Sequence, residues 1–150
     1  MKQEMIVSVC VVAYNEEDYL PGLLECILEQ DYDHKKIEVV LIDSMSTDTT
    51  KQKMQEFMKL YKDSFWDIQV ADNIKKIQSS GWNKAISISK GDIIIRVDAH
   101  SKITNDFVYN NVRCMENGEK ITGGPRPCIV EDSTPWKETA SIAPPTARST

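Results

Sequence analysis

Short apolar runs recur along the first two thirds of the chain, separated by segments with helical spacing. Residues 6–13, 37–42, 65–70 and 93–97 are rich in β-branched residues and predict four strands. The first run is apolar almost without interruption, which is typical of a strand covered on both faces in a parallel sheet. The segments between the runs therefore predict helices that connect one strand to the next.

Each connecting segment carries one apolar stripe at the spacing of a helix face. The first stripe comprises Leu20, Leu23, Leu24, Ile27 and Leu28. The second comprises Met54, Phe57, Met58 and Tyr61. The third comprises Trp82, Ala85, Ile86 and Ser89, and the fourth Phe107, Val108, Val112 and Met115. Ser46 or Thr47 is the predicted N-cap of the second helix, Gly91 is predicted to close the third, and residues 104–106 are predicted to begin the fourth.

Strands that alternate with helices predict an α/β fold, a doubly wound and mostly parallel sheet with right-handed crossovers and helices on both faces. Ligands of such sheets bind at the carboxyl ends of the strands, where the strand order reverses. From Gly123 onward the periodicity fades and Pro, Ser and Thr accumulate. We therefore predict one domain over residues 1–125 and an irregular, disordered tail over residues 126–150.

Composition narrows the functional classes. The 150 residues are 41% hydrophobic and 27% charged, with a net charge of -5, which fits one globular domain. Lysine and arginine do not cluster, so we expect no nucleic-acid partner. No apolar run approaches the ~20 residues of a membrane span, and we expect membrane association only through segments outside this chain. The four cysteines lie far apart, which favours structural roles in a reducing, cytoplasmic setting.

The last predicted strand ends in a pair of metal-ligand types. Asp98 and His100 are two residues apart, so in an extended segment their side chains point to the same side. A carboxylate beside an imidazole suits Mn²⁺ or Mg²⁺ better than structural zinc. A turn-capping aspartate beside a solvated histidine is the alternative. A histidine ligand must be neutral, so metal binding is expected to weaken in acid.

Polar residues also follow the first two strands. Asn15 and Glu16 come after the first, and Asp43 ends the second. All of these residues belong to the carboxyl edge of the predicted sheet, where a ligand is expected. Helix capping is the alternative role for each of them.

Three ordered segments, residues 7–16, 39–50 and 90–100, together resemble the N-terminal half of a family 2 glycosyltransferase, a family with the GT-A, Rossmann-like fold. The resemblance spans about residues 6–125. The Asp-Ala-His form at residues 98–100, with Gly123-Gly124-Pro125 after it, is most similar to the succinoglycan-type branch of bacterial polysaccharide-building enzymes.

The resemblance implies an inverting transferase that binds a nucleotide-diphosphate sugar, with UDP the expected nucleotide, and passes the sugar to a polysaccharide or lipid-linked acceptor. It implies Mn²⁺ or Mg²⁺ at Asp98 and His100, with Asp98 also near the donor ribose. The remaining implied donor-binding residues are Ala13, Tyr14, Asn15, Glu16, Asp43, Lys76 and Asn83. Ala13, Tyr14 and Glu16 would frame the base, and Lys76 would reach a phosphate unless it is merely solvated.

An inverting transferase needs a general base, which the resemblance implies lies well downstream of Asp98. Glu131-Asp132 comes too early and is interpreted as a surface turn. We therefore expect a donor-binding part, truncated on its C-terminal side. The alternatives are a receiver-type signalling module with Asp43 as phosphoacceptor, a nucleotidyltransferase, for which the glycine-rich phosphate loop is absent, and a folded remnant that binds nothing.

Overall fold

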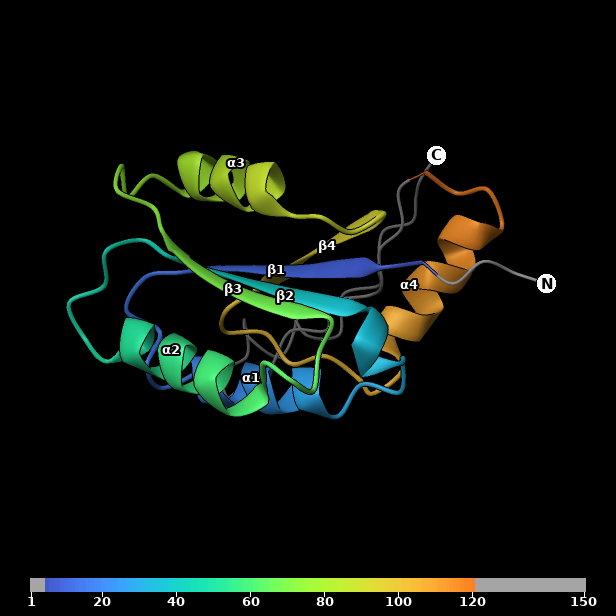
Figure 1. Cartoon of the computed structure of the whole chain (residues 1–150). Helices are drawn as coiled ribbons and strands as arrows, with labels where there is room; N and C mark the ends of the chain where they lie inside the picture. Colours follow the sequence, from blue (N-terminus) through green and yellow to red (C-terminus); the bar gives the residue numbers. More distant parts are fainter. Residues whose placement is uncertain (1–4, 121–150) are drawn as a thin grey trace, which may run out of the picture.

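The computed structural model describes residues 5–120, and its sheet has the predicted parallel architecture (Figure 1). The strands are β1 (Val7–Ala13), β2 (Ile37–Asp43), β3 (Asp67–Asp72) and β4 (Ile93–Asp98). They lie in the order β3-β2-β1-β4, and every neighbouring pair is parallel. The strand order thus reverses at β1, which has β2 on one side and β4 on the other.

The strand register brings the carboxyl ends to one edge of the sheet. Ala13 pairs with Asp43 between β1 and β2, and Asp43 also pairs with Asp72 of β3. Val12 pairs with Asp98 at the end of β4. Polar residues that are far apart in the sequence therefore meet at this edge, as the pattern predicts.

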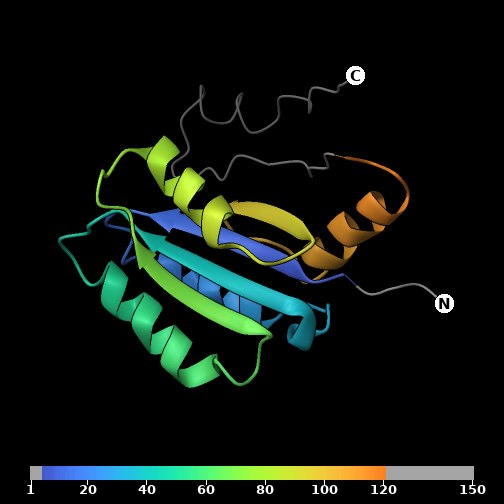
Figure 2. The ribbon, with the colours of Figure 1, turned by 45° about the horizontal axis from the view of Figure 1, so that its top comes forward.

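Helices cover the two faces of the sheet unequally. They are α1 (Leu20–Leu28), α2 (Thr50–Tyr61), α3 (Gln78–Ile88) and α4 (Phe107–Glu116), with the 3-10 helix η1 (His34–Lys36) before β2. Figure 2 shows α3 on the opposite side of the sheet from α1 and α2. The larger core lies on the α1, α2 and α4 side, and α3 contributes Ala85 to a smaller one with Cys10, Val40 and Ile42.

Several sequence-based boundaries shift for identifiable reasons. β3 begins at Asp67 and not at residue 65, because Phe65 packs into the core ahead of the strand. α2 begins at Thr50, so neither Ser46 nor Thr47 is its N-cap. α3 ends at Ile88, and Gly91 does not close it. A side chain at Gly91 would instead meet Ser8 and the backbone of Ile6 at 2.6 to 2.8 Å, so this glycine permits a close approach to β1.

β4 is buried on one face and exposed on the other. Its residues alternate between buried and exposed, and Ile94 and Arg96 face outward. The reason is that α3 packs mainly on β1 and β2 and leaves that face of β4 open. Ile86 of α3 is correspondingly 54% exposed, while Trp82 is half-buried against the smaller core.

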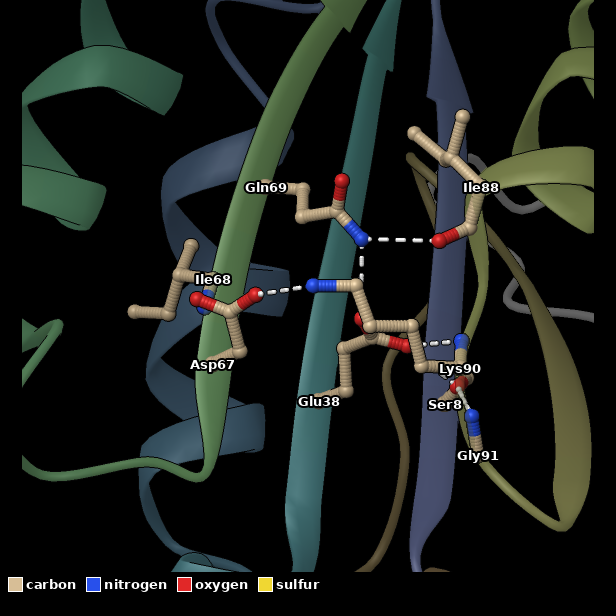
Figure 3. Close-up of polar contacts among 8 residues, drawn as sticks. All are labelled: Ser8, Glu38, Asp67, Ile68, Gln69, Ile88, Lys90 and Gly91. Atoms are coloured by element: carbon tan, nitrogen blue, oxygen red, sulfur yellow. Dashed lines mark hydrogen bonds and ion pairs between the residues drawn. The ribbon is translucent and has the colours of Figure 1, made fainter.

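A buried polar network ties the start of β4 to the rest of the sheet (Figure 3). The fully buried carboxylate of Glu38 accepts hydrogen bonds from the Ser8 hydroxyl at 2.6 Å and from the backbone N–H of Lys90 at 2.8 Å. Its second oxygen accepts from the Gln69 amide at 2.8 Å, and Ser8 Oγ accepts from the Gly91 N–H at 2.9 Å. A buried carboxylate is tolerated when its oxygens are paired in this way.

Within residues 5–120 no helix is both long and apolar enough to cross a bilayer. The predicted tail over residues 126–150, the Gly123-Gly124-Pro125 motif and Glu131-Asp132 lie outside the described residues.

Candidate functional site

A cavity of about 200 Å³ opens at the carboxyl edge of the sheet. It is lined by the ends of β1 and β4, the residue after β2, and the loop that enters α3. Six of the residues proposed from the sequence line it: Ala13, Tyr14, Glu16, Lys76, Asp98 and His100. The lining residues not proposed from the sequence are Val12, Ser44, Gln78 and Ala99. Ser44 and Ala99 adjoin proposed residues, whereas no local pattern pointed to Gln78.

Asn15 lies outside the cavity lining and joins two loops. Its backbone N–H donates to Ser46 Oγ at 2.9 Å, and its side-chain oxygen accepts the N–H of Thr47 at 2.8 Å. Its amide nitrogen donates to Thr47 Oγ1 at 3.2 Å. The Asn15 backbone has a φ of 50°, a left-handed conformation that asparagine tolerates better than most residues. These contacts give Asn15 a structural role beside the site.

The same two loops are joined again at the start of α2. Glu17 accepts a hydrogen bond from the Thr49 hydroxyl at 2.6 Å and another from the Thr49 backbone N–H at 3.1 Å. The hydroxyl bond, followed by the backbone bond, lowers the pKa of Glu17. Asp48 accepts from the N–H of Thr50 at 2.9 Å and from the N–H of Glu17 at 3.3 Å. Carboxylates at this position suit a helix N-terminus. The interloop clamp is formed by Asn15, Glu17, Ser46, Thr47, Asp48, Thr49 and Thr50.

Asp43 is buried next to the cavity residue Ser44. One carboxylate oxygen accepts the N–H of Ser46 at 3.2 Å, and the other is buried and has no hydrogen-bond partner among the described residues. An unpaired buried carboxylate oxygen is costly unless a ligand group donates to it. With the Asp43 side chain only 1% exposed, the arrangement does not suit an accessible phosphoacceptor.

Lys76 is an exposed cation that a tight turn holds at the cavity. Its N–H donates to the Asn73 carbonyl at 3.1 Å, and its φ is 63°. The buried Asn73 side chain donates to Ser44 Oγ at 3.0 Å and to the Ile77 carbonyl at 2.9 Å. Asn73 therefore couples the Lys76 turn to the end of β2, a role that sequence reasoning missed.

Asn83 is exposed on α3 and does not line the cavity. The structure thus does not bring it together with the other residues proposed from the sequence.

Asp98 and His100 both line the cavity, as their spacing predicts. Asp98 Oδ1 lies 3.8 Å from Arg96 Nε, and His100 Nδ1 lies 3.4 Å from Glu16 Oε1. Within residues 5–120, no three Asp, Glu, His or Cys side chains converge closely enough to hold a metal alone. Two protein donors still fit a hard cation whose remaining ligands are phosphate oxygens and waters, as Mg²⁺ sites commonly show.

Comparisons with known proteins show the family to which the chain belongs. Residues 8–148 match the family model described as glycosyl transferase family 2. A Methanococcus voltae relative, a dolichyl N-acetyl-alpha-D-glucosaminyl phosphate 3-beta-D-2,3-diacetamido-2,3-dideoxy-beta-D-glucuronosyltransferase, is 32% identical over 76% of this chain and 35% of its own. An Escherichia coli UDP-Glc:alpha-D-GlcNAc-diphosphoundecaprenol beta-1,3-glucosyltransferase is 31% identical over 77% of this chain and 43% of its own.

Among solved structures, the mannosyltransferase from Pyrobaculum calidifontis in complex with GDP-Man and Mn²⁺ superposes with a TM-score of 0.67. It is 28% identical, and the match covers 74% of this chain and 32% of that one. The chain thus spans about a third of the length of the first relatives it matches. The match over residues 8–148 and the GT-A architecture together show that the chain belongs to glycosyl transferase family 2.

Proposed function

We propose that this chain binds a nucleotide-diphosphate sugar, with UDP as the nucleotide, together with Mn²⁺ or Mg²⁺ held by Asp98 and His100. The observation that carries the proposal is the convergence of the Lys76 cation with these two side chains on one cavity. A diphosphate needs positive charge around it, and an uncharged pocket would not supply that.

The neighbouring residues suit the nucleoside. Tyr14 is 52% exposed at the cavity, so its ring is available to pack against a base. Asp43 does not line the cavity but lies next to the cavity residue Ser44, so its unpaired oxygen would accept a base N–H or a ribose hydroxyl only if donor binding uncovers it. Lys76 contacts the phosphates. The divalent cation, when bound, supplies charge neutralisation on the departing diphosphate.

In the whole protein, we propose inverting transfer of the sugar to a polysaccharide or lipid-linked acceptor. The names of the Methanococcus voltae and Escherichia coli relatives support transfer to lipid-linked acceptors, and the latter supports UDP. The Asp-Ala-His form at residues 98–100 supports the succinoglycan-type branch. We assign the catalytic base to none of the described residues, because the family resemblance implies a base well downstream of Asp98.

Calorimetric titration of the 150-residue chain with UDP, in Mn²⁺ and in EDTA, tests the proposal. We expect Mn²⁺ to tighten UDP binding about tenfold or more, and Asp98→Asn to remove that gain. Asp31→Asn is the matched control, because Asp31 is exposed and follows α1 at the opposite edge of the sheet. Absence of UDP binding by a chain that unfolds cooperatively would refute the proposed nucleotide, and absence of GDP binding as well would refute the donor site.

A further inference from the structure

Glu16 and His100 meet across the cavity although 84 residues separate them in the sequence. Glu16 Oε1 lies 3.4 Å from His100 Nδ1, and both residues line the cavity. The two side chains come from different loops, one after β1 and one after β4. This contact is therefore a product of the sheet topology and not of local sequence.

The main chain of Glu16 is held firmly. Its N–H donates to Thr50 Oγ1 at 2.8 Å, and its carbonyl accepts the N–H of Leu20 at 2.8 Å. Thr50 and Leu20 are both fully buried. The Glu16 side chain is 23% exposed, whereas that of His100 is 63% exposed. The carboxylate is thus the better fixed partner, and the imidazole is the group that gains orientation from the contact.

A neutral imidazole carries its proton on either Nδ1 or Nε2. A hydrogen-bond acceptor beside one of these nitrogens favours the tautomer that has the proton there. A carboxylate beside Nδ1 favours the tautomer with the proton on Nδ1, which leaves the Nε2 lone pair for a metal. Metal-bound histidines commonly donate their other N–H to a carboxylate in this way. Glu16 contacts His100 at Nδ1 and leaves Nε2 for the metal, so Glu16 is placed to act through His100.

We infer that Glu16 is a positioning residue, which accepts the Nδ1 proton of His100 and so aims Nε2 at the divalent cation. The inference rests on the proposed function, since it assigns His100 as a ligand. It differs from the base-framing role that the family resemblance implies for Glu16. The two roles predict different outcomes when Glu16 is replaced.

The first test replaces Glu16 by a residue of similar length that cannot accept the proton. In Glu16→Met we expect the ratio of UDP affinity in Mn²⁺ to UDP affinity in EDTA to fall about tenfold or more, the usual effect of losing such a partner. Glu16→Gln keeps an acceptor oxygen and should restore part of the gain. Glu25→Met makes the same replacement at an exposed position of α1 and serves as control. An equal loss of UDP affinity in EDTA and in Mn²⁺ would leave that ratio unchanged, which would instead support base framing and overturn the inference.

A second test removes the imidazole. His100→Asp supplies a carboxylate that has no ring proton to donate, so Glu16→Met should cause no further loss of Mn²⁺ binding in that background. The coupling between the two substitutions is the quantity to measure. If Glu16→Met weakens Mn²⁺ binding as much in the His100→Asp background as in the native chain, Glu16 acts independently of the imidazole ring. That result overturns the inference.

The tautomer can be read without metal or donor. The sequence contains two histidines, His34 and His100, so their ¹⁵N imidazole signals are readily assigned with His34→Gln. We expect the Nδ1–H form of His100 in the native chain and a shift toward Nε2–H in Glu16→Met. An unchanged tautomer would refute the Glu16 contact even if UDP and Mn²⁺ bind. If neither ligand binds and the tautomer does shift, only the proposed function fails.

Discussion

The guanidinium of Arg96 lies over the ring of Trp82, with its carbon 4.3 Å from the ring centroid. The same side chain places Nε 3.8 Å from Asp98 Oδ1. Trp82 of α3 thus supports a cation beside the proposed metal ligand on β4. A cation at this distance stabilises the Asp98 carboxylate and opposes the approach of a second positive charge.

Replacing Arg96 should therefore favour metal binding in the absence of nucleotide. In Arg96→Met we expect Mn²⁺ affinity to rise roughly twofold to fivefold, because a unit charge about 4 Å away in water-like surroundings contributes up to about 1 kcal/mol. Titration of the nucleotide-free chain with Mn²⁺ measures the change. Lys90→Met is the control, because it removes a positive charge that pairs with Asp67 at the far end of β4. Equal effects of the two variants would mean that net charge, and not the Arg96 contact, sets the affinity.

Asn15 has a left-handed backbone and side-chain hydrogen bonds to Thr47. Two substitutions separate the effects of the backbone and of the side chain on the stability of the protein. Asn15→Ala and Asn15→Gly lose the same side-chain bonds, but glycine adopts a positive φ without strain. We expect the alanine variant to be less stable than the glycine variant by about 1 kcal/mol. Urea unfolding measures both values. Equal stability of the two variants would show that the backbone relaxes and stores no strain.

Local sequence patterns predicted the architecture, because the spacing of apolar residues that marks a strand or a helix can be read within one short segment. The four runs and their connecting stripes were enough to predict the parallel sheet and its ligand edge. Contacts between distant segments could not be predicted in this way. The bond from Thr47 to Asn15 and the capping of α2 by Glu17 join residues 32 apart, so Thr47, which looked like an N-cap, is used elsewhere.

The structure places residues that adjoin a strand end, such as Ala13 and Asp98, at one cavity, as the sequence predicts. Asn83 does not line the cavity, because a helical residue points into a site only if the helix turns that face toward it, and here α3 exposes Asn83. Asn73 in the loop after β3 and Gln78 at the first position of α3 were missed, because a single amide at the end of an element belongs to no periodic pattern. The half-exposed β4 also went unpredicted, since burial of a strand face depends on which helix covers it.

Gly91 is expected to tolerate no side chain, because a Cβ there would lie 2.6 Å from Ser8 Oγ and 2.8 Å from the Ser8 backbone nitrogen. It would also disturb the N–H that Gly91 donates to Ser8 within the Glu38 network. We expect Gly91→Ala to lower the free energy of unfolding by about 2 kcal/mol or more, as overpacking of a rigid site does. Urea unfolding measures the loss.

Gly22 of α1 provides the opposite case. A Cβ there meets no atom within 4 Å, so Gly22→Ala should raise stability by about 0.5 to 1 kcal/mol through the helix propensity of alanine. A Gly91→Ala variant as stable as Gly22→Ala would show that the start of β4 can move away from β1.

The thiol of Cys10 should make the stability of the protein fall in alkali. Burial, opposed by a hydrogen bond with Ser89 and reinforced by the charge of Glu38, raises the pKa of Cys10 from 9.0 to about 11. Between these values the unfolded chain releases the thiol proton and the folded chain keeps it. The stability that the protonated thiol contributes is therefore complete below about pH 9 and is lost as the pH rises toward 11.

Unfolding free energies measured from pH 8 to 11 in the native chain and in Cys10→Ala test this linkage. Lysine and tyrosine side chains titrate in the same pH window. The informative quantity is therefore the difference in unfolding free energy between the native chain and Cys10→Ala at each pH. We expect the native chain to lose on the order of 2 kcal/mol more than Cys10→Ala, because each pKa unit corresponds to about 1.4 kcal/mol. Parallel curves would mean that the Cys10 thiolate is accommodated in the folded sheet.

Iodoacetamide at pH 8 should correspondingly modify the half-buried Cys26 and Cys114 before Cys10, since the thiolate is the reactive form.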